Sequence, residues 1–348
     1  MKILLASEEL TAQPEEGLLV FTMHLCRYLD SLGELTVLHA LGDPEEHLRS
    51  LRILSPKVLM TDRLVRFLRK ERFDVVLYIP SSGLTGFGLG RSLLLRYIAR
   101  SPTILIALQE RPVGALHRIV ALMGHPELIL SPVKGLSAHL ARLGFDTGFI
   151  MPGYDRNLFR PVDPDVKRSL RVQYGLPLDR YIVLHVGHVR ETRNMQAFLR
   201  YREWGENIQP VIKAGEQDPA WRDRLRRAGI IVIDEYIAGV HEIYQAADCY
   251  LFPVSCPTGA LEFPLSVIEA AACNLPVLTT RFGALPDVIP EGNGILYFEN
   301  VSDIPRYLLK IKELKVNTSK VVRELSWESV FGRYLAPHLE GMALMDGK

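Results

Sequence analysis

The 348-residue sequence is poor in cysteine, and its four cysteines include no pair at the two-residue spacing of zinc or redox motifs. Most of them lie in apolar or structured segments. We therefore expect reduced side chains in a cytoplasmic protein, rather than a disulfide framework or a zinc site. The four are Cys26, Cys249, Cys256 and Cys273.

The sequence also lacks a long hydrophobic run. No apolar stretch approaches the ~20 residues that a helix needs to cross a bilayer. The opening residues, MKILLASEEL, reach charged side chains too early for a signal peptide and predict a buried strand instead. From these patterns we expect a protein that does not span a membrane.

A large net charge is absent as well, since the formal charge is only +1. A balance this close to neutral argues against nucleic acid as a partner held by the whole surface. The charge is uneven, however: residues 63–142 contain 12 Lys and Arg against 4 Asp and Glu. Two interpretations stay open, namely solvated helix faces, or a surface for an anionic acceptor or for membrane head groups.

Short apolar segments alternate with helical patterns through the whole chain, which predicts an α/β fold with mostly parallel sheets. At this length we expect two domains, with a charged and polar linker at Asp163–Arg168. The predicted organisation is 1–162, 163–325, and a last helix in 326–348. Strands are expected at Lys2–Ala6, Leu35–His39, Val58–Met60, Val75–Ile79, Ile104–Leu108, Leu128–Leu130, Tyr181–Val186, Pro210–Ala214, Ile230–Ile233 and Cys249–Phe252.

The segment Glu262–Pro276, EFPLSVIEAAACNLP, combines a helix with an unusual charge. Asn274 followed by Pro276 is a helix stop signal. The start of this helix offers free N–H groups and a positive dipole end to a phosphate. Glu269 lies in an otherwise apolar face, where a carboxylate needs hydrogen-bond donors. Ligand hydroxyls and a buried Lys or Arg are both possible donors.

Two further loops follow predicted strands and carry polar groups. Arg190 and Arg193 lie between a strand and a predicted helix, Met195–Trp204, where guanidinium groups could clamp a diphosphate or simply face solvent. Gln109 follows the strand Ile104–Leu108 and either contacts a substrate or belongs to a capped loop. No GxGxxG follows the first strand, which disfavours a dehydrogenase.

Several segments in order resemble the GT-B glycosyltransferases, closest to the large retaining group often called family 4. The resemblance covers roughly residues 128–335, and the first 127 residues match only in strand–helix rhythm. The segments are PGYDRNLFRP, VGHVRETRN, ADCYLFPVSCPTGALEFPLSVIEAAACNLPVL, RFGALPDVIPEGNGILYF and LSWESVFGRYL.

This resemblance implies two Rossmann-like doubly wound domains, with the C-terminal helix packing back on the N-terminal one. A nucleoside diphosphate sugar would bind the C-terminal domain as donor substrate, without metal or cofactor. A glycan, a lipid-linked molecule or a small molecule would bind the N-terminal domain as acceptor, and peripheral contact with a membrane is compatible with this.

The resemblance also assigns roles to residues. Glu269 would hold the ribose hydroxyls, and Arg193 falls on the family's phosphate-binding lysine. Backbone groups at the start of the helix would meet the diphosphate. The glycine that follows the strand Tyr181–Val186 would also belong to the donor-binding positions. These backbone positions are Phe263, Pro264, Leu265, Ser266 and Gly187.

Four positions depart from the family pattern. Leu261 stands where the family has its first glutamate, and Glu262 comes one position late. His188 replaces an arginine, for which Arg190 could substitute. Gln109 stands where a histidine is common, and Gly17 is a single glycine where the family has two.

Our leading hypothesis is a retaining transfer of one sugar to an acceptor hydroxyl, involving Arg193, Arg190, Gln109 and Glu262. The alternative hypothesis is a non-catalytic or regulatory relative that binds a nucleotide or a sugar, because the four departures fall in one active site. An epimerase or a phosphorylase on the same architecture is a third class.

Overall fold

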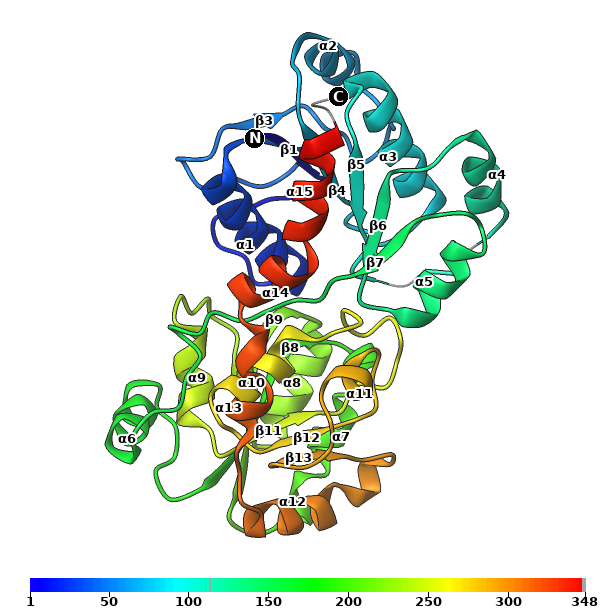
Figure 1. Cartoon of the computed structure of the whole chain (residues 1–348). Coiled ribbons are helices and arrows are strands. Elements are labelled where there is room, and N and C mark those ends of the chain that lie inside the picture. The colour runs from blue at the N-terminus through cyan, green and yellow to red at the C-terminus, as the bar shows by residue number, and fades with distance from the viewer. Residues whose placement is uncertain (110, 113, 346–348) are drawn as a thin grey trace. The chain divides into compact units, whose positions relative to one another are not determined.

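The computed structural model describes residues 1–109, 111–112 and 114–345. It consists of two compact units (Figure 1). Unit 1 contains Met1–Pro152 together with the segment that begins at Trp327, and unit 2 contains Gly153–Ser326. No helix among the described residues combines the length and the hydropathy needed to cross a bilayer.

Unit 1 is built on a seven-stranded parallel sheet in the order β3-β2-β1-β4-β5-β6-β7. The order reverses between β1 and β4, as in a doubly wound fold. The strands are β1 Lys2–Ser7, β2 Glu34–His39, β3 Ser50–Arg52, β4 Val75–Ile79, β5 Thr103–Ile106, β6 Leu128–Ser131 and β7 Thr147–Phe149. The helices between them are α1 Gly17–Leu32, α2 Asp62–Lys70, α3 Gly86–Ala99, α4 Ala115–Met123 and α5 Lys134–Ala141.

Helices α2 to α5 cover one face of this sheet, because their inward residues belong to a single apolar core with the strands. Helix α1 packs against α14 Trp327–Tyr334, and the last helix, α15 Ala336–Met345, packs against α14 and β4. The Trp327 ring stacks on the His24 ring with 4.6 Å between the ring centroids, and the centroids of Phe331 and Phe21 lie 5.5 Å apart. The predicted return of the C-terminal segment to the N-terminal domain is confirmed, with two helices in place of one.

Unit 2 contains a six-stranded parallel sheet in the order β10-β9-β8-β11-β12-β13. Its order reverses between β8 and β11, so the predicted second doubly wound sheet is confirmed. The strands are β8 Tyr181–Val189, β9 Ile208–Gln217, β10 Ile231–Ile233, β11 Cys249–Phe252, β12 Val277–Thr279 and β13 Ile295–Tyr297. The helices are α6 Pro164–Gln173, α7 Gln196–Leu199, α8 Pro219–Arg227, α9 Val240–Ala246, α10 Leu265–Ala272, α11 Leu285–Val288, α12 Ile304–Glu313 and α13 Thr318–Val321.

Two predicted elements are wrong. Val58–Met60 is a loop rather than a strand, because the buried Arg91 donates hydrogen bonds to the carbonyls of Val58 and Leu59. Strand β3 lies earlier in the chain. Met195–Trp204 is not one helix, since α7 has only four residues between the 3₁₀ turns Glu191–Arg193 and Tyr201–Trp204.

The two compact units divide after Pro152, earlier than the predicted boundary at residue 162. Residues 153–162 belong with unit 2 because they pack on its helix α9. Gln245 on that helix donates hydrogen bonds to the carbonyls of Leu158 and Arg160, each at 3.1 Å, and Phe159 meets the ring of Tyr244. The charged residues at 163–168 begin helix α6 instead of forming a linker.

Candidate functional site

The reversal of strand order between β8 and β11 places two loops of unit 2 side by side. In sheets of this kind ligands bind beyond the carboxyl ends of the strands at such a point. The amide Nδ2 of Asn194, after β8, donates to the carbonyl of Pro253, after β11, at 3.1 Å. At Gly259 an added Cβ would lie 2.6 Å from the Thr192 carbonyl, so the loops touch through a glycine.

The loop after β8 presents the two predicted arginines. Gly187 has φ +150°, and a Cβ there would lie 3.0 Å from Nη1 of Arg193. Glycine therefore lets the guanidinium lie directly against the strand end. Arg190 is half-exposed, and its nearest carboxylate is that of Glu216 at 3.9 Å, an exposed pair of little energy.

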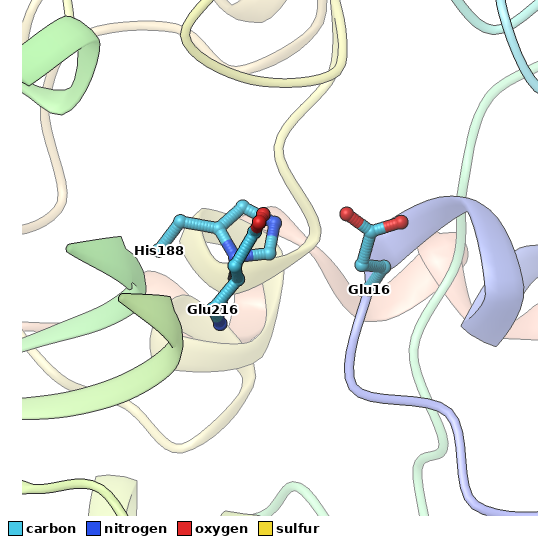
Figure 2. Close-up of side chains that lie close together, drawn as sticks. All are labelled: Glu16, His188 and Glu216. Atoms are coloured by element: carbon cyan, nitrogen blue, oxygen red, sulfur yellow. Dashed lines mark hydrogen bonds between the residues drawn. The ribbon is translucent and has the colours of Figure 1, made fainter. Parts of the chain in front are cut away.

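His188 joins β8 to β9 at a β-bulge. Its buried ring accepts the backbone N–H of Glu216 on Nδ1 at 3.0 Å. Figure 2 shows the ring beside Glu216; the third side chain drawn there, Glu16, is the N-cap of α1 in unit 1. The hydrogen bond to Nδ1 holds the ring against the end of β9.

Buried polar atoms without a hydrogen-bond partner among the described residues include Nε of Arg190 and Oγ1 of Thr192 in the loop after β8, and Nε2 of His185 within that strand. Buried polar atoms in native proteins are nearly always paired, so such a group calls for a ligand or an ordered water. Desolvation, helped by the charge of Arg193, lowers the pKa of His185 to about 3. The ring is therefore neutral, and it adds no positive charge to this loop.

The loop after β11 leads into α10, which begins at Leu265 with Pro264 as N-cap. The N–H groups of its first turn lack intrahelical acceptors and carry the positive end of the dipole. Phe263 is fully buried and anchors this helix start, while Ser266 is partly exposed. Main-chain donors at the positions predicted for a diphosphate are therefore present.

Glu262 lies in the same loop and is buried. Its carbonyl accepts the N–H of Ala284 at 2.8 Å, and Gly283, at φ +52°, would place a Cβ only 2.2 Å from that oxygen. The close approach fixes the backbone of Glu262 against the loop after β12. Leu261 precedes it and is half-buried.

Glu269 projects from α10 and is partly buried. The hydroxyl of Tyr244 donates a hydrogen bond of 2.7 Å to its carboxylate. Burial raises the pKa of Glu269 to about 7, against a smaller lowering by that hydroxyl. The structure thus gives Glu269 a tyrosine hydroxyl as a donor, where we expected ligand hydroxyls or a Lys or Arg. This hydroxyl uses only part of the carboxylate's acceptor capacity.

Tyr250 on β11 connects Glu269 with the arginine loop. Burial raises the pKa of its phenol, while a hydrogen bond with Ser266 and the charge of Arg193 lower it. Its hydroxyl also lies 3.4 Å from the carbonyl of Val186. Arg193, Ser266 and Glu269 therefore surround one buried tyrosine, which brings the two predicted binding segments together.

Residues 180–313 match the family model described as glycosyl transferases group 1. Most of the second unit thus matches the group 1 glycosyltransferase family. The matched residues contain both loops at the strand reversal, so the family match and the site coincide.

Two curated relatives match parts of this chain. The D-inositol 3-phosphate glycosyltransferase 2 of Catenulispora acidiphila is 30% identical over 179 residues, 45% of this chain and 40% of the relative. The D-inositol 3-phosphate glycosyltransferase of Mycobacterium leprae is 28% identical over 209 residues, 54% of this chain and 47% of the relative. The chain thus spans less than half the length of these relatives.

Among solved structures, Anabaena HepE in complex with UDP has a similar fold. Its TM-score is 0.76 at 13% identity, over 98% of this chain and 100% of that one. HepE in complex with UDP-glucose superposes with a TM-score of 0.69 at 12% identity, over 99% of each chain. These matches confirm the predicted GT-B fold class.

The matched residues 180–313 contain all but two of the predicted site residues. Gly17 is the first residue of α1, and Gln109 follows β5; both belong to unit 1. The Oε1 of Gln109 accepts from Arg111 at 3.4 Å, and its backbone carbonyl lies against Gly83. The predicted roles of these two residues toward a sugar stay predictions.

Sequence reasoning missed Tyr244, whose hydroxyl donates to Glu269, and Tyr250, whose hydroxyl hydrogen-bonds to Ser266 and the carbonyl of Val186. The available signal was a polar-tipped side chain within a buried helix and within the strand CYLF. Periodicity alone gives no partner for such a hydroxyl, because the partner lies on another element.

Proposed function

We propose that this chain transfers a sugar from a nucleoside diphosphate sugar to an acceptor hydroxyl. The observation that supports this best is the group of partnerless buried polar atoms beside Arg193, at the strand reversal of a group 1 glycosyltransferase domain. The two relatives named above are called glycosyltransferases, and HepE was solved with UDP and with UDP-glucose. UDP-glucose is therefore the first donor to test.

The diphosphate would lie between the arginine loop and the start of α10. Arg193 and Arg190 supply guanidinium donors, and the N–H groups of Leu265 and Ser266 supply uncharged ones. Guanidinium groups match phosphate oxygens in a planar fork, so two oxygens can be held at once.

The ribose would be held by Glu269. An ionised carboxylate has about four acceptor sites, and Tyr244 uses one of them. Two ribose hydroxyls can donate to the rest. Because the pKa of Glu269 is about 7 without ligand, hydroxyl donors that favour the charged form would lower it.

The chemical step would depend on stabilising the leaving diphosphate as the sugar carbon gains positive charge. Fixed donors aimed at the developing negative charge achieve this without reorganisation. Gln109 can steady a sugar hydroxyl but cannot act as a base, so the departing phosphate would take the acceptor proton. Glu262 would support the loop that carries these donors. Retention, independence from metal, a cytoplasmic location and the identity of the acceptor stay predictions.

The test is Arg193→Ala, assayed by nucleotide release from UDP-glucose with a panel of acceptors. Losing one fixed charge donor from the leaving group should lower turnover roughly 10²–10³-fold, and Arg193→Lys should recover part of it. Arg226→Ala is the matched control. Arg226 lies on helix α8, and its guanidinium pairs with Asp234 at 2.7 Å. Unchanged turnover in Arg193→Ala would refute the clamp.

Calorimetry on the wild type separates transfer from mere binding. Tight binding of nucleotides without release from any of a wide panel of donors would refute the proposed transfer. It would point to the non-catalytic alternative.

A further inference from the structure

Helix α4 of unit 1 exposes a row of large apolar side chains to solvent. Leu116, Ile119, Leu122 and Met123 are 54%, 55%, 90% and 69% exposed. The exposed ring of Tyr97 on α3 adjoins them, because its hydroxyl donates to the carbonyl of Met123 at 3.2 Å. We call these five side chains the α4 patch.

The patch is not the usual outer face of a surface helix. The inner face of α4 is already buried, with Val120 in the core and His117 hydrogen-bonded to the Leu84 carbonyl at 3.1 Å. A helix that is apolar all round is normally covered on every side. Clustered exposed apolar side chains on a water-soluble surface indicate an interaction site, whereas single ones do not.

The same helical layer is strongly basic. Helices α2 to α5 share one core against one face of the sheet, and their outward sides carry exposed arginines. Glu127, an acidic residue of this region, is paired with Arg96 at 2.6 Å. Arg118 lies on α4 itself and Arg100 at the end of α3, the helix that carries Tyr97; the other exposed arginines of the layer are Arg63, Arg66 and Arg69 on α2 and Arg142 at the end of α5.

We propose that the α4 patch, with the arginines of α2 to α5, docks on the head-group region of an anionic lipid bilayer. An apolar helix face that enters the acyl boundary, flanked by cations that meet anionic head groups, is the pattern of interfacial helices. With nine residues, α4 lies along the surface instead of crossing it. The inference does not depend on the proposed transfer.

A second copy of this chain fits the same face less well. A symmetric dimer would bring each patch against the same patch of the other copy, so the arginine-rich rims would face one another. Like charges across an interface are unfavourable. The excess of positive charge therefore favours a negative partner surface.

Flotation with lipid vesicles tests the proposal on the full-length protein. We expect it to float with vesicles of phosphatidylcholine and phosphatidylglycerol, and much less with phosphatidylcholine alone. High salt should release much of it, because exposed charges are screened. Failure to float with the anionic vesicles would overturn the proposal.

The decisive variant is the double substitution Ile119→Ser/Leu122→Ser. Removing two inserted apolar side chains should weaken partition into anionic vesicles at least roughly tenfold. Leu309→Ser on α12, at a side chain 63% exposed, is the matched control and should leave partition unchanged. Arg118→Ala should weaken partition roughly fivefold.

Thermal melting and sedimentation accompany these variants. The substituted side chains are exposed, so melting should stay at the wild-type temperature. Equal partition of the double variant and the wild type would contradict the proposal. A lipid-free wild-type dimer that the double variant converts to a monomer would contradict it as well, and would assign the patch to a second copy.

Discussion

The points where the two sheets reverse their strand order differ in how their polar groups are matched. In unit 1 the reversal lies between β1 and β4, and Glu8 sits there, buried, directly after β1. Its carboxylate accepts from the Tyr78 hydroxyl, from Nη1 of Arg91 at 2.6 Å and from the Ser81 N–H at 2.7 Å. The fully buried Arg91 also donates to the carbonyls of residues 55, 58 and 59.

In unit 2 the corresponding region keeps unmatched polar atoms on Arg190, Thr192 and His185 among the described residues. At the first reversal the charges close a loop onto the sheet, whereas at the second some buried polar atoms have no hydrogen-bond partner among the described residues. The comparison teaches that two sheets of the same doubly wound type can differ in whether the polar groups at the reversal of strand order are matched. This is consistent with the donor binding unit 2.

The largest expected effect comes from breaking the closed network of unit 1. Arg91→Ala leaves Glu8 as a buried charge without its cation, which should lower the free energy of unfolding by about 3–5 kcal/mol. Urea denaturation followed by fluorescence measures it. Nucleotide affinity of the folded protein should not change, since Arg91 lies in unit 1.

The double variant Glu8→Leu/Arg91→Met is the control for this prediction. It removes both charges and should recover much of the loss, because a buried ion pair replaced by apolar groups is often neutral or better. A single-variant cost below about 1 kcal/mol would show that the network is not the closed structure described here.

A smaller effect is expected from Glu269→Gln. The pKa of Glu269 is about 7 in the folded chain against an ordinary 4.5, so the folded state holds this proton to higher pH than the unfolded state. The contribution of this group to wild-type stability should therefore be largest below about pH 4.5 and should decrease by about 3 kcal/mol as the pH rises to about 7.

The measurement is the difference in unfolding free energy between wild type and Glu269→Gln across this pH range. The variant should lack this part of the slope and be the more stable protein at pH 8, while its nucleotide affinity should fall roughly tenfold. Parallel pH profiles of the two proteins would contradict the assignment.

The smallest effect should come from the edge of the arginine loop. Glu216→Gln removes the carboxylate 3.9 Å from Arg190 but keeps the backbone N–H that His188 accepts. The free energy of unfolding, followed by thermal melting, should change by no more than about 0.5 kcal/mol, as for other exposed pairs. A large loss would mean that Arg190 depends on this carboxylate for its position.

Features that depend on neighbours in the chain could be predicted from the sequence. The alternation of strands and helices is local, and Asn274 does adopt the left-handed conformation, at φ +58°, that its place after a helix predicts. Glu269 could be recognised because a lone carboxylate in an apolar helix face needs an explanation wherever it lies.

Features that depend on distant partners could not be predicted. Glu8 meets Tyr78 and Arg91 across 70 and 83 positions of sequence, and no local pattern relates them. Likewise the apolar positions of α4 look the same in sequence whether a helix is covered on one face or on both. The tyrosines beside Glu269 were missed for the same reason.

The contribution of α14 and α15 to unit 1 bears on how the chain folds as it is synthesised. A ribosome completes all of residues 153–326 before it adds Trp327, whose ring stacks on His24. Domains usually fold in the order of their synthesis. Here the order should invert for the final step: the later-made unit 2 can finish first, while the aromatic face of α1 waits for the last helices to emerge.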